Sequence, residues 1–177
     1  MKLQKYLLLP VVLLGLAFMT MAFVHDTAQH EPVVATPPVE HASDLLMDGE
    51  ELYMTRCLSC HMTNGEGVPG VFPPLTESEY VTGDKGRLIR MILNGLSGEI
   101  VVNGVTYSGM MPPWGGFLND EQVADVLTYI RGAFGNDADA ISADEVARVR
   151  AAVGDRKDTW TIDELNQEEN LGIPDGD

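Results

Sequence analysis

The stretch Cys57-Leu58-Ser59-Cys60-His61 decides how this chain folds. Two cysteines three positions apart project from one side of a helical turn, and the next residue places an imidazole beside them. This spacing lets one short turn bind a haem through two thioether bonds and supply a ligand to its iron. The pentapeptide therefore predicts a redox protein with one covalently bound haem c, attached to Cys57 and Cys60 and ligated by His61.

Other interpretations of the pentapeptide fit the rest of the chain less well. A thioredoxin-like motif would follow a strand, whereas residues 43–56 have the apolar periodicity of an amphipathic helix. A structural zinc site needs four ligands at paired spacings, but the chain has only these two cysteines. A plain disulfide or a chance match is the minor alternative.

A haem iron bound by histidine on one face needs either a sixth ligand or an open site. The candidate ligands, Met110 and Met111, lie in a loop-like segment over residues 107–114. Pro112 and Pro113 stiffen this segment, and burial in a helix does not account for its methionines. We favour Met111 over Met110 because it adjoins the prolines.

With these motifs, residues 43–135 resemble the monohaem class I c-type cytochromes. In that family the haem-binding motif ends a first helix, a proline follows the histidine, and a Met-Pro loop precedes a last helix. All three features occur here in that order. The resemblance implies that the carbonyl of Pro73 accepts a hydrogen bond from the imidazole of His61, while His61 and Met111 bind the iron.

The expected fold class is all-α: a cytochrome c fold with a small β-hairpin before the Met loop and a C-terminal helical extension. A helix is predicted over residues 84–93, and Asn103-Gly104 predicts the turn of a hairpin over residues 100–107. Gly49 and Tyr53 on the first helix resemble the residues at which that helix crosses the last one in the family, with Val126 and Tyr129 opposite. Helix starts are predicted at Ser43, Asn119 with Gln122, Ser142 with Glu145, and Thr161 with Glu164.

The composition divides the chain into four segments. Residues 6–24 are apolar and follow Lys2 and Lys5, which predicts a single-pass membrane anchor with the haem domain on the periplasmic side. A cleaved signal peptide, which would give a soluble periplasmic protein, is the alternative. The predicted segments are an anchor or signal peptide at 1–24, a Pro-rich linker at 25–42, the haem domain at 43–136 and an acidic helical extension at 137–177.

The chain is strongly acidic, with 27 acidic and 11 basic residues and a net charge of −16. This charge excludes nucleic acid as a partner and predicts that partner proteins present a basic or apolar patch. Trp114, Phe117 and Phe72 lie near the Met segment or the haem motif and are candidates for an apolar contact with such a partner, with core packing as the alternative.

The resemblance implies a one-electron carrier and not an enzyme. It further implies a dehydrogenase or quinol-oxidising complex as the electron donor and a terminal oxidase as the acceptor. One alternative is a non-shuttling haem subunit of a larger membrane oxidoreductase complex. Another is a haem enzyme or gas sensor with a labile sixth ligand.

Overall fold

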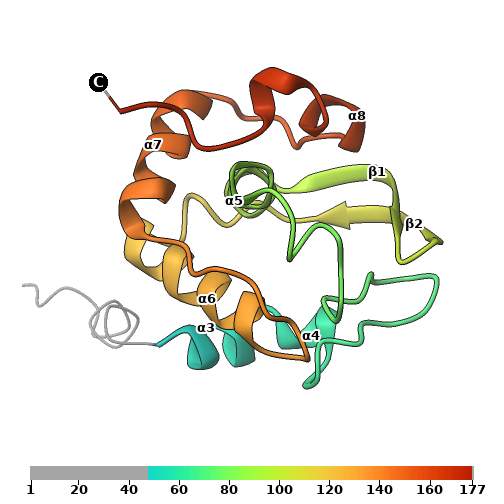
Figure 1. The fold of residues 1–177 in the computed structure, drawn as a ribbon. Coiled ribbons are helices and arrows are strands. Elements are labelled where there is room, and N and C mark those ends of the chain that lie inside the picture. Colours follow the sequence, from blue (N-terminus) through green and yellow to red (C-terminus); the bar gives the residue numbers. More distant parts are fainter. Residues whose placement is uncertain (1–47, 177) are drawn as a thin grey trace, which may run out of the picture. The chain divides into compact units, whose positions relative to one another are not determined.

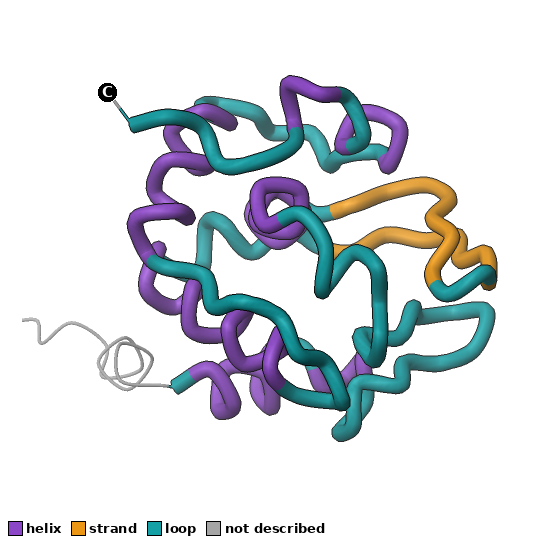
Figure 2. Tube along the Cα trace, viewed as in Figure 1, coloured by secondary structure: helices purple, strands orange, loops and turns teal. Residues whose placement is uncertain are grey.

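The structure is a computed structural model that describes residues 48–176. The elements are α3 (Gly49–Arg56), α4 (Leu58–His61), α5 (Lys85–Asn94), β1 (Leu96–Val102), β2 (Val105–Met111), α6 (Asp120–Gly132), α7 (Ala143–Val153), α8 (Ile162–Leu165) and a 3-10 turn (Glu168–Asn170). In this part of the chain, helices and long loops make up most of the fold, and one hairpin lies at its side, next to α5 and α8 (Figures 1 and 2).

Helices α3 and α6 cross where the chain has its predicted small and aromatic residues. An added Cβ on Gly49 would lie 2.2 Å from the carbonyl oxygen of Asp125 and 2.8 Å from the Cβ of Tyr129. Tyr53 is fully buried, and its ring lies 5.7 Å from that of Tyr129 and 5.0 Å from that of Phe134. The close helix contact and these aromatic rings fix the first helix, and with it the turn that follows.

The crossing yields a stability prediction. In a Gly49→Ala variant the new methyl group must displace the backbone of α6, so we expect a loss of about 1–3 kcal/mol of unfolding free energy. Gly132→Ala is the matched control, because it is also helical and its Cβ would meet no atom within 4 Å. That variant should be neutral or slightly more stable. Denaturant unfolding of both variants measures the difference, and equal stabilities would contradict the proposed clash.

The hairpin is longer than the sequence indicates. Asn103 and Gly104 form its turn with φ angles of 51° and 77°, as predicted. The strands extend beyond residues 100–107, however, and pair antiparallel until Leu96 lies opposite Met111. The predicted combination of helices with one small hairpin is therefore confirmed in residues 48–176, although the two-stranded sheet means that the fold is not strictly all-α. The expected loop at Met110 and Met111 is corrected, because both residues belong to β2.

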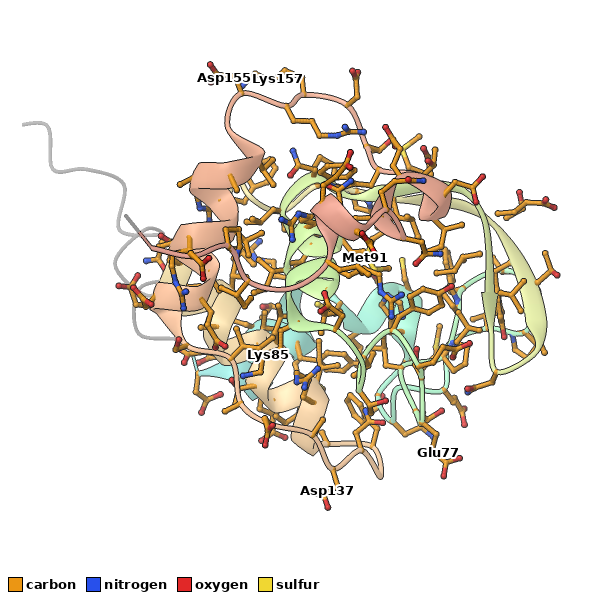
Figure 3. The ribbon with its side chains drawn as sticks, turned by 45° about the horizontal axis from the view of Figure 1, so that its top comes forward. Glu77, Lys85, Met91, Asp137, Asp155 and Lys157 are labelled. Carbon is orange, nitrogen blue, oxygen red and sulfur yellow. The ribbon has the colours of Figure 1, made fainter. Side chains whose placement is uncertain are left out.

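The C-terminal extension packs on the domain through α7 and the segments that follow it. Val146 and Val149 of α7 are fully buried in the core cluster that also contains α5 and α6 residues. Lys85, labelled in Figure 3, forms an ion pair of 3.0 Å with Glu145 of α7. The predicted capping boxes begin α6, α7 and α8.

Trp160 is 6% exposed and clusters with Leu165, so its side chain packs within the domain. Its indole ring is covered by the guanidinium of Arg156, whose carbon lies 3.6 Å from the ring centroid. Arg156 in turn donates to both carboxylate oxygens of Glu164 at 2.9 and 3.0 Å. Trp160 therefore belongs to the interior of the domain.

The predicted single-pass membrane localisation is corrected. Within residues 48–176, no helix is sufficiently long and apolar to cross a membrane. The predicted span at residues 6–24 lies outside the described residues, as do the linker at 25–42 and the predicted cap Ser43. The described chain begins at Asp48, whose carboxylate accepts a hydrogen bond from the backbone N–H of Glu51 and caps α3.

Candidate functional site

A cavity of about 510 Å³ lies between the turn after α3, the loop at 71–75, α5, the hairpin and α6. In Figure 1, α4 lies at the bottom of the domain and the hairpin lies above it to the right. Side chains from both of these elements reach the same cavity. Among the residues that line it are Cys57, Cys60, His61, Pro73, Met111 and Trp114.

The two cysteines are presented by the junction of α3 and α4. The backbone N–H of Cys57 donates to the carbonyl of Tyr53 and ends α3, and the N–H groups of Cys60 and His61 both donate to the carbonyl of Cys57. Burial, followed by the neighbouring Cys60, raises the pKa of Cys57 to about 11. Cys57 and Cys60 are not joined by a disulfide, and both side chains line the cavity.

The imidazole of His61 has its orientation and tautomer set by Pro73. The distance from Nδ1 to the Pro73 carbonyl oxygen is 3.0 Å. A carbonyl can only accept, so Nδ1 carries the proton and Nε2 keeps the lone pair that a metal needs. Burial lowers the pKa of His61, while the bond to Pro73 opposes this shift. The neutral imidazole, which is the metal-binding form, is therefore favoured.

The loop after α4 is hydrogen-bonded to Tyr53, at the crossing of α3 and α6. The hydroxyl of Tyr53 donates to the carbonyl of Met62 at 2.5 Å, and the N–H of Leu75 donates to the carbonyl of Gly65 at 2.7 Å. An added Cβ on Gly67 would lie 2.7 Å from the Pro73 carbonyl oxygen, the acceptor of the imidazole bond. The Pro73 carbonyl can therefore keep its position only while residue 67 is a glycine.

Asn136 is a supporting residue that the sequence analysis missed. Its amide donates to the carbonyls of Leu75 and Ile130 at 3.0 and 2.9 Å and accepts from the N–H of Glu77 at 2.8 Å. Figure 3 shows Glu77 and Asp137, the residue that follows Asn136, near the same edge of the domain. Asn136 thus joins the end of α6 to the cavity loop. A buried asparagine after Gly135 carries no recognisable motif, so no local signal predicted this role.

The two candidate methionines differ in exposure. Met110 is 70% exposed, whereas Met111 is partly buried and packs against both core clusters. This difference follows from the strand, since successive side chains of β2 point to opposite faces. Gly95 approaches this position so closely that an added Cβ would lie 2.4 Å from the Met111 carbonyl oxygen. Both methionines and His61 line the same cavity, and Met111 is the more buried of the two methionines.

The three aromatic residues singled out in the sequence have different surroundings. Phe72 and Trp114 are partly buried and line the cavity, whereas Phe117 is 77% exposed. The rings of Trp114 and Phe117 pack edge to face with centroids 6.1 Å apart. Phe72 and Trp114 therefore form part of the cavity wall, and of these three residues only Phe117 is exposed at the surface.

The donor set matches a haem. Two thiols lie on one turn, and a neutral imidazole adjoins them. A thioether from the hairpin lines the same cavity, whose wall is otherwise mainly apolar. In residues 48–176 there is no group of three or more His, Cys, Asp or Glu side chains that could hold a bare metal ion. These residues fit an iron porphyrin that the chain binds covalently and encloses in apolar surroundings.

Comparisons with known proteins agree with this geometry. Residues 46–133 match the family model described as cytochrome c. Cytochrome c-552 of Thermus thermophilus is 40% identical over 114 residues, which cover 59% of this chain and 85% of that protein. The gluconate 2-dehydrogenase cytochrome c subunit of Pantoea cypripedii is 37% identical over 107 residues, covering 58% of this chain and 24% of the subunit.

A third relative is the cytochrome c subunit of alcohol dehydrogenase (quinone) from Gluconobacter oxydans (strain 621H). It is 33% identical over 105 residues, which cover 58% of this chain and 22% of that subunit. Together with the Cys57-to-His61 motif, these matches show that the protein carries covalently bound haem c and transfers electrons, and that it is not an enzyme. The chain belongs to the cytochrome c family.

Proposed function

We propose that Cys57 and Cys60 would hold one haem covalently and that His61 and Met111 would supply the ligands to its iron. When bound, the haem supplies an iron that cycles between the ferrous and ferric states. The observation that carries the proposal is that His61, oriented by Pro73, and Met111 reach a single cavity from two separate elements. Thioether ligation favours the ferrous iron and so raises the reduction potential.

The same proposal assigns distinct tasks to the surrounding residues. The Pro73 carbonyl holds the proton on Nδ1 of His61 and fixes the plane of the ring. Apolar side chains of α5 and the hairpin exclude water, which keeps the change in solvent polarisation small when an electron moves. Residues 43–136 constitute the haem domain, with 137–177 as an extension packed on it.

We place the protein as a one-electron carrier between a dehydrogenase or quinol-oxidising complex and a terminal oxidase. The match to cytochrome c-552 over most of that protein's length supports a free carrier. The matches to dehydrogenase cytochrome subunits favour a second candidate, a fixed haem subunit of a larger complex. Co-purification distinguishes them: a carrier elutes alone and is reduced by added partners, whereas a subunit elutes with a dehydrogenase.

The test of the ligand assignment uses the native haem-loaded protein. The oxidised protein should show the far-red absorption band of a sulfur-to-ferric-iron bond, and the reduced protein should bind carbon monoxide only slowly. Both results follow from a sixth position occupied by Met111. Rapid carbon monoxide binding with no far-red band would instead favour the haem enzyme or gas sensor with a labile sixth ligand.

A second prediction concerns the imidazole. In Gly67→Ala the new methyl group would push against the Pro73 carbonyl, so the hydrogen bond from His61 weakens. The imidazole becomes a weaker donor to ferric iron, and we expect the reduction potential to rise by about 30–60 mV. Redox titration measures the shift.

Gly70→Ala is the matched control for this experiment. Gly70 also has a positive φ, 73° against 64° for Gly67, but its added Cβ would meet no atom within 4 Å. Backbone strain therefore affects both variants similarly, while only Gly67→Ala displaces the Pro73 carbonyl. Equal potentials for the two variants would show that the Pro73 bond does not tune the iron.

A further inference from the structure

The C-terminal extension is hydrogen-bonded to β1, the strand that pairs with Met111, and to the loop that follows Met111. Upstream, the N–H of Ser97 donates to the carbonyl of Trp160 at 2.8 Å, and the N–H of Trp160 donates to the carbonyl of Gly95 at 3.1 Å. These bonds form a parallel bridge between Trp160 and Leu96. Leu96 is the residue that pairs with Met111 across the hairpin, so only β1 separates Trp160 from the methionine backbone.

Downstream, Arg150 of α7 binds the loop that leaves the methionine. Its Nη1 donates to the carbonyl of Gly115 at 2.6 Å, and its Nη2 donates to the carbonyl of Leu118 at 3.0 Å. Its Nε forms an ion pair of 2.7 Å with Asp120, at the first turn of α6. One guanidinium therefore binds two points of the loop between Met111 and α6 and the first residue of α6 itself.

We infer that the extension positions Met111, with Arg150 as the principal positioning residue. The inference rests on the proposed ligand role of Met111. The segment that carries Met111 can move away from the iron only if its attachments open. Besides the pairing with β1 and two backbone bonds to α5, these attachments include Arg150 of α7 and, through β1, the segment around Trp160. Loss of the Arg150 contacts should raise the fraction of protein in which the methionine is detached.

Carbon monoxide reports that fraction directly. Because the gas binds ferrous iron only when the sixth position is free, its apparent affinity scales with the population of the detached state. In Arg150→Gln we expect this population, and the association rate of the gas, to rise about tenfold, which corresponds to about 1.4 kcal/mol. The far-red sulfur band of the ferric protein should also be lost at a lower denaturant concentration than in the parent protein.

The matched control is Arg148→Gln on the same helix. Arg148 donates to the carbonyl of Pro174 and forms an ion pair with Asp144. Both partners belong to the C-terminal extension and not to the segment after Met111. This variant should keep the parent carbon monoxide rate even if its melting temperature falls. Arg150→Lys, which retains a charge for Asp120 but lacks the guanidinium fork, should lie between the parent and Arg150→Gln.

Two outcomes would overturn the inference. One is a parent-like carbon monoxide rate and far-red band in a folded, haem-loaded Arg150→Gln protein. The other is an equal rise in rate for the Arg148 and Arg150 variants, which would indicate general loosening. A wrong ligand assignment can be told apart from a wrong positioning role for Arg150. If Met111 is not the ligand, Met111→Ala will leave the far-red band of the full-length protein unchanged.

Discussion

A Met111→Ala protein is expected to lose the far-red sulfur-to-iron band and to bind carbon monoxide rapidly when reduced. The side chain is the partly buried thioether of the hairpin, and alanine leaves the sixth position of the iron open. Without the thioether the ferrous state loses its preferred ligand, so we expect the reduction potential to fall by on the order of 0.2 V. Absorption spectra, gas-binding kinetics and redox titration measure the three effects.

Met110→Ala is the control, since the two methionines are adjacent and differ chiefly in exposure. Met110 is 70% exposed on the other face of β2, so its loss should change neither the spectrum nor the potential. The reverse pattern, with a normal Met111→Ala spectrum and an altered Met110→Ala spectrum, would reassign the ligand.

His61→Ala is expected to prevent stable haem incorporation. The imidazole is the only histidine side chain in residues 48–176, and its Nε2 lone pair is made available by the Nδ1 bond to Pro73. Without it the iron has no ligand on the motif side, and we expect the haem content to fall by at least about tenfold. Pyridine haemochrome analysis of equal amounts of protein measures the content.

Ser59→Ala provides the comparison for this experiment. Ser59 lies within the same turn and is exposed, and its hydroxyl oxygen lies 3.8 Å from the neighbouring Cys60 sulfur. Its variant should load haem normally, which separates loss of the ligand from disturbance of the turn. A fully loaded His61→Ala protein would contradict the assignment of the motif-side ligand.

The sequence predicts the local elements of this domain well where side chains near in sequence determine them. The Asn103-Gly104 turn and the capping residue Asn119 occur where the residue types place them. The pairing of the hairpin beyond residues 100–107 could not be predicted, because Ser97, Gly98 and Gly109 have little intrinsic preference for strands. Those residues pair because the hairpin packs between the cavity and Trp160.

Long-range polar contacts around the site were also beyond prediction. His61 and Pro73 belong to a recognisable pattern, whereas Asn136 and Arg150 act through backbone carbonyls that any residue could supply. Such contacts depend on the folded path of the chain and leave no periodicity or spacing in the sequence. The sequence therefore indicates the atoms that meet the haem more clearly than those that hold the surrounding loops.

The bond between Asn136 and Leu75 joins residues that are 61 positions apart. Because the two residues are so far apart in the chain, this bond can form only after the end of α6 has packed beside the loop at 62–75. Before that packing, Asn136 does not hold the loop over the Cys57-to-His61 turn, and the two thiols are open to solvent. The long-range bond therefore makes enclosure of the cysteines a property of the completed fold.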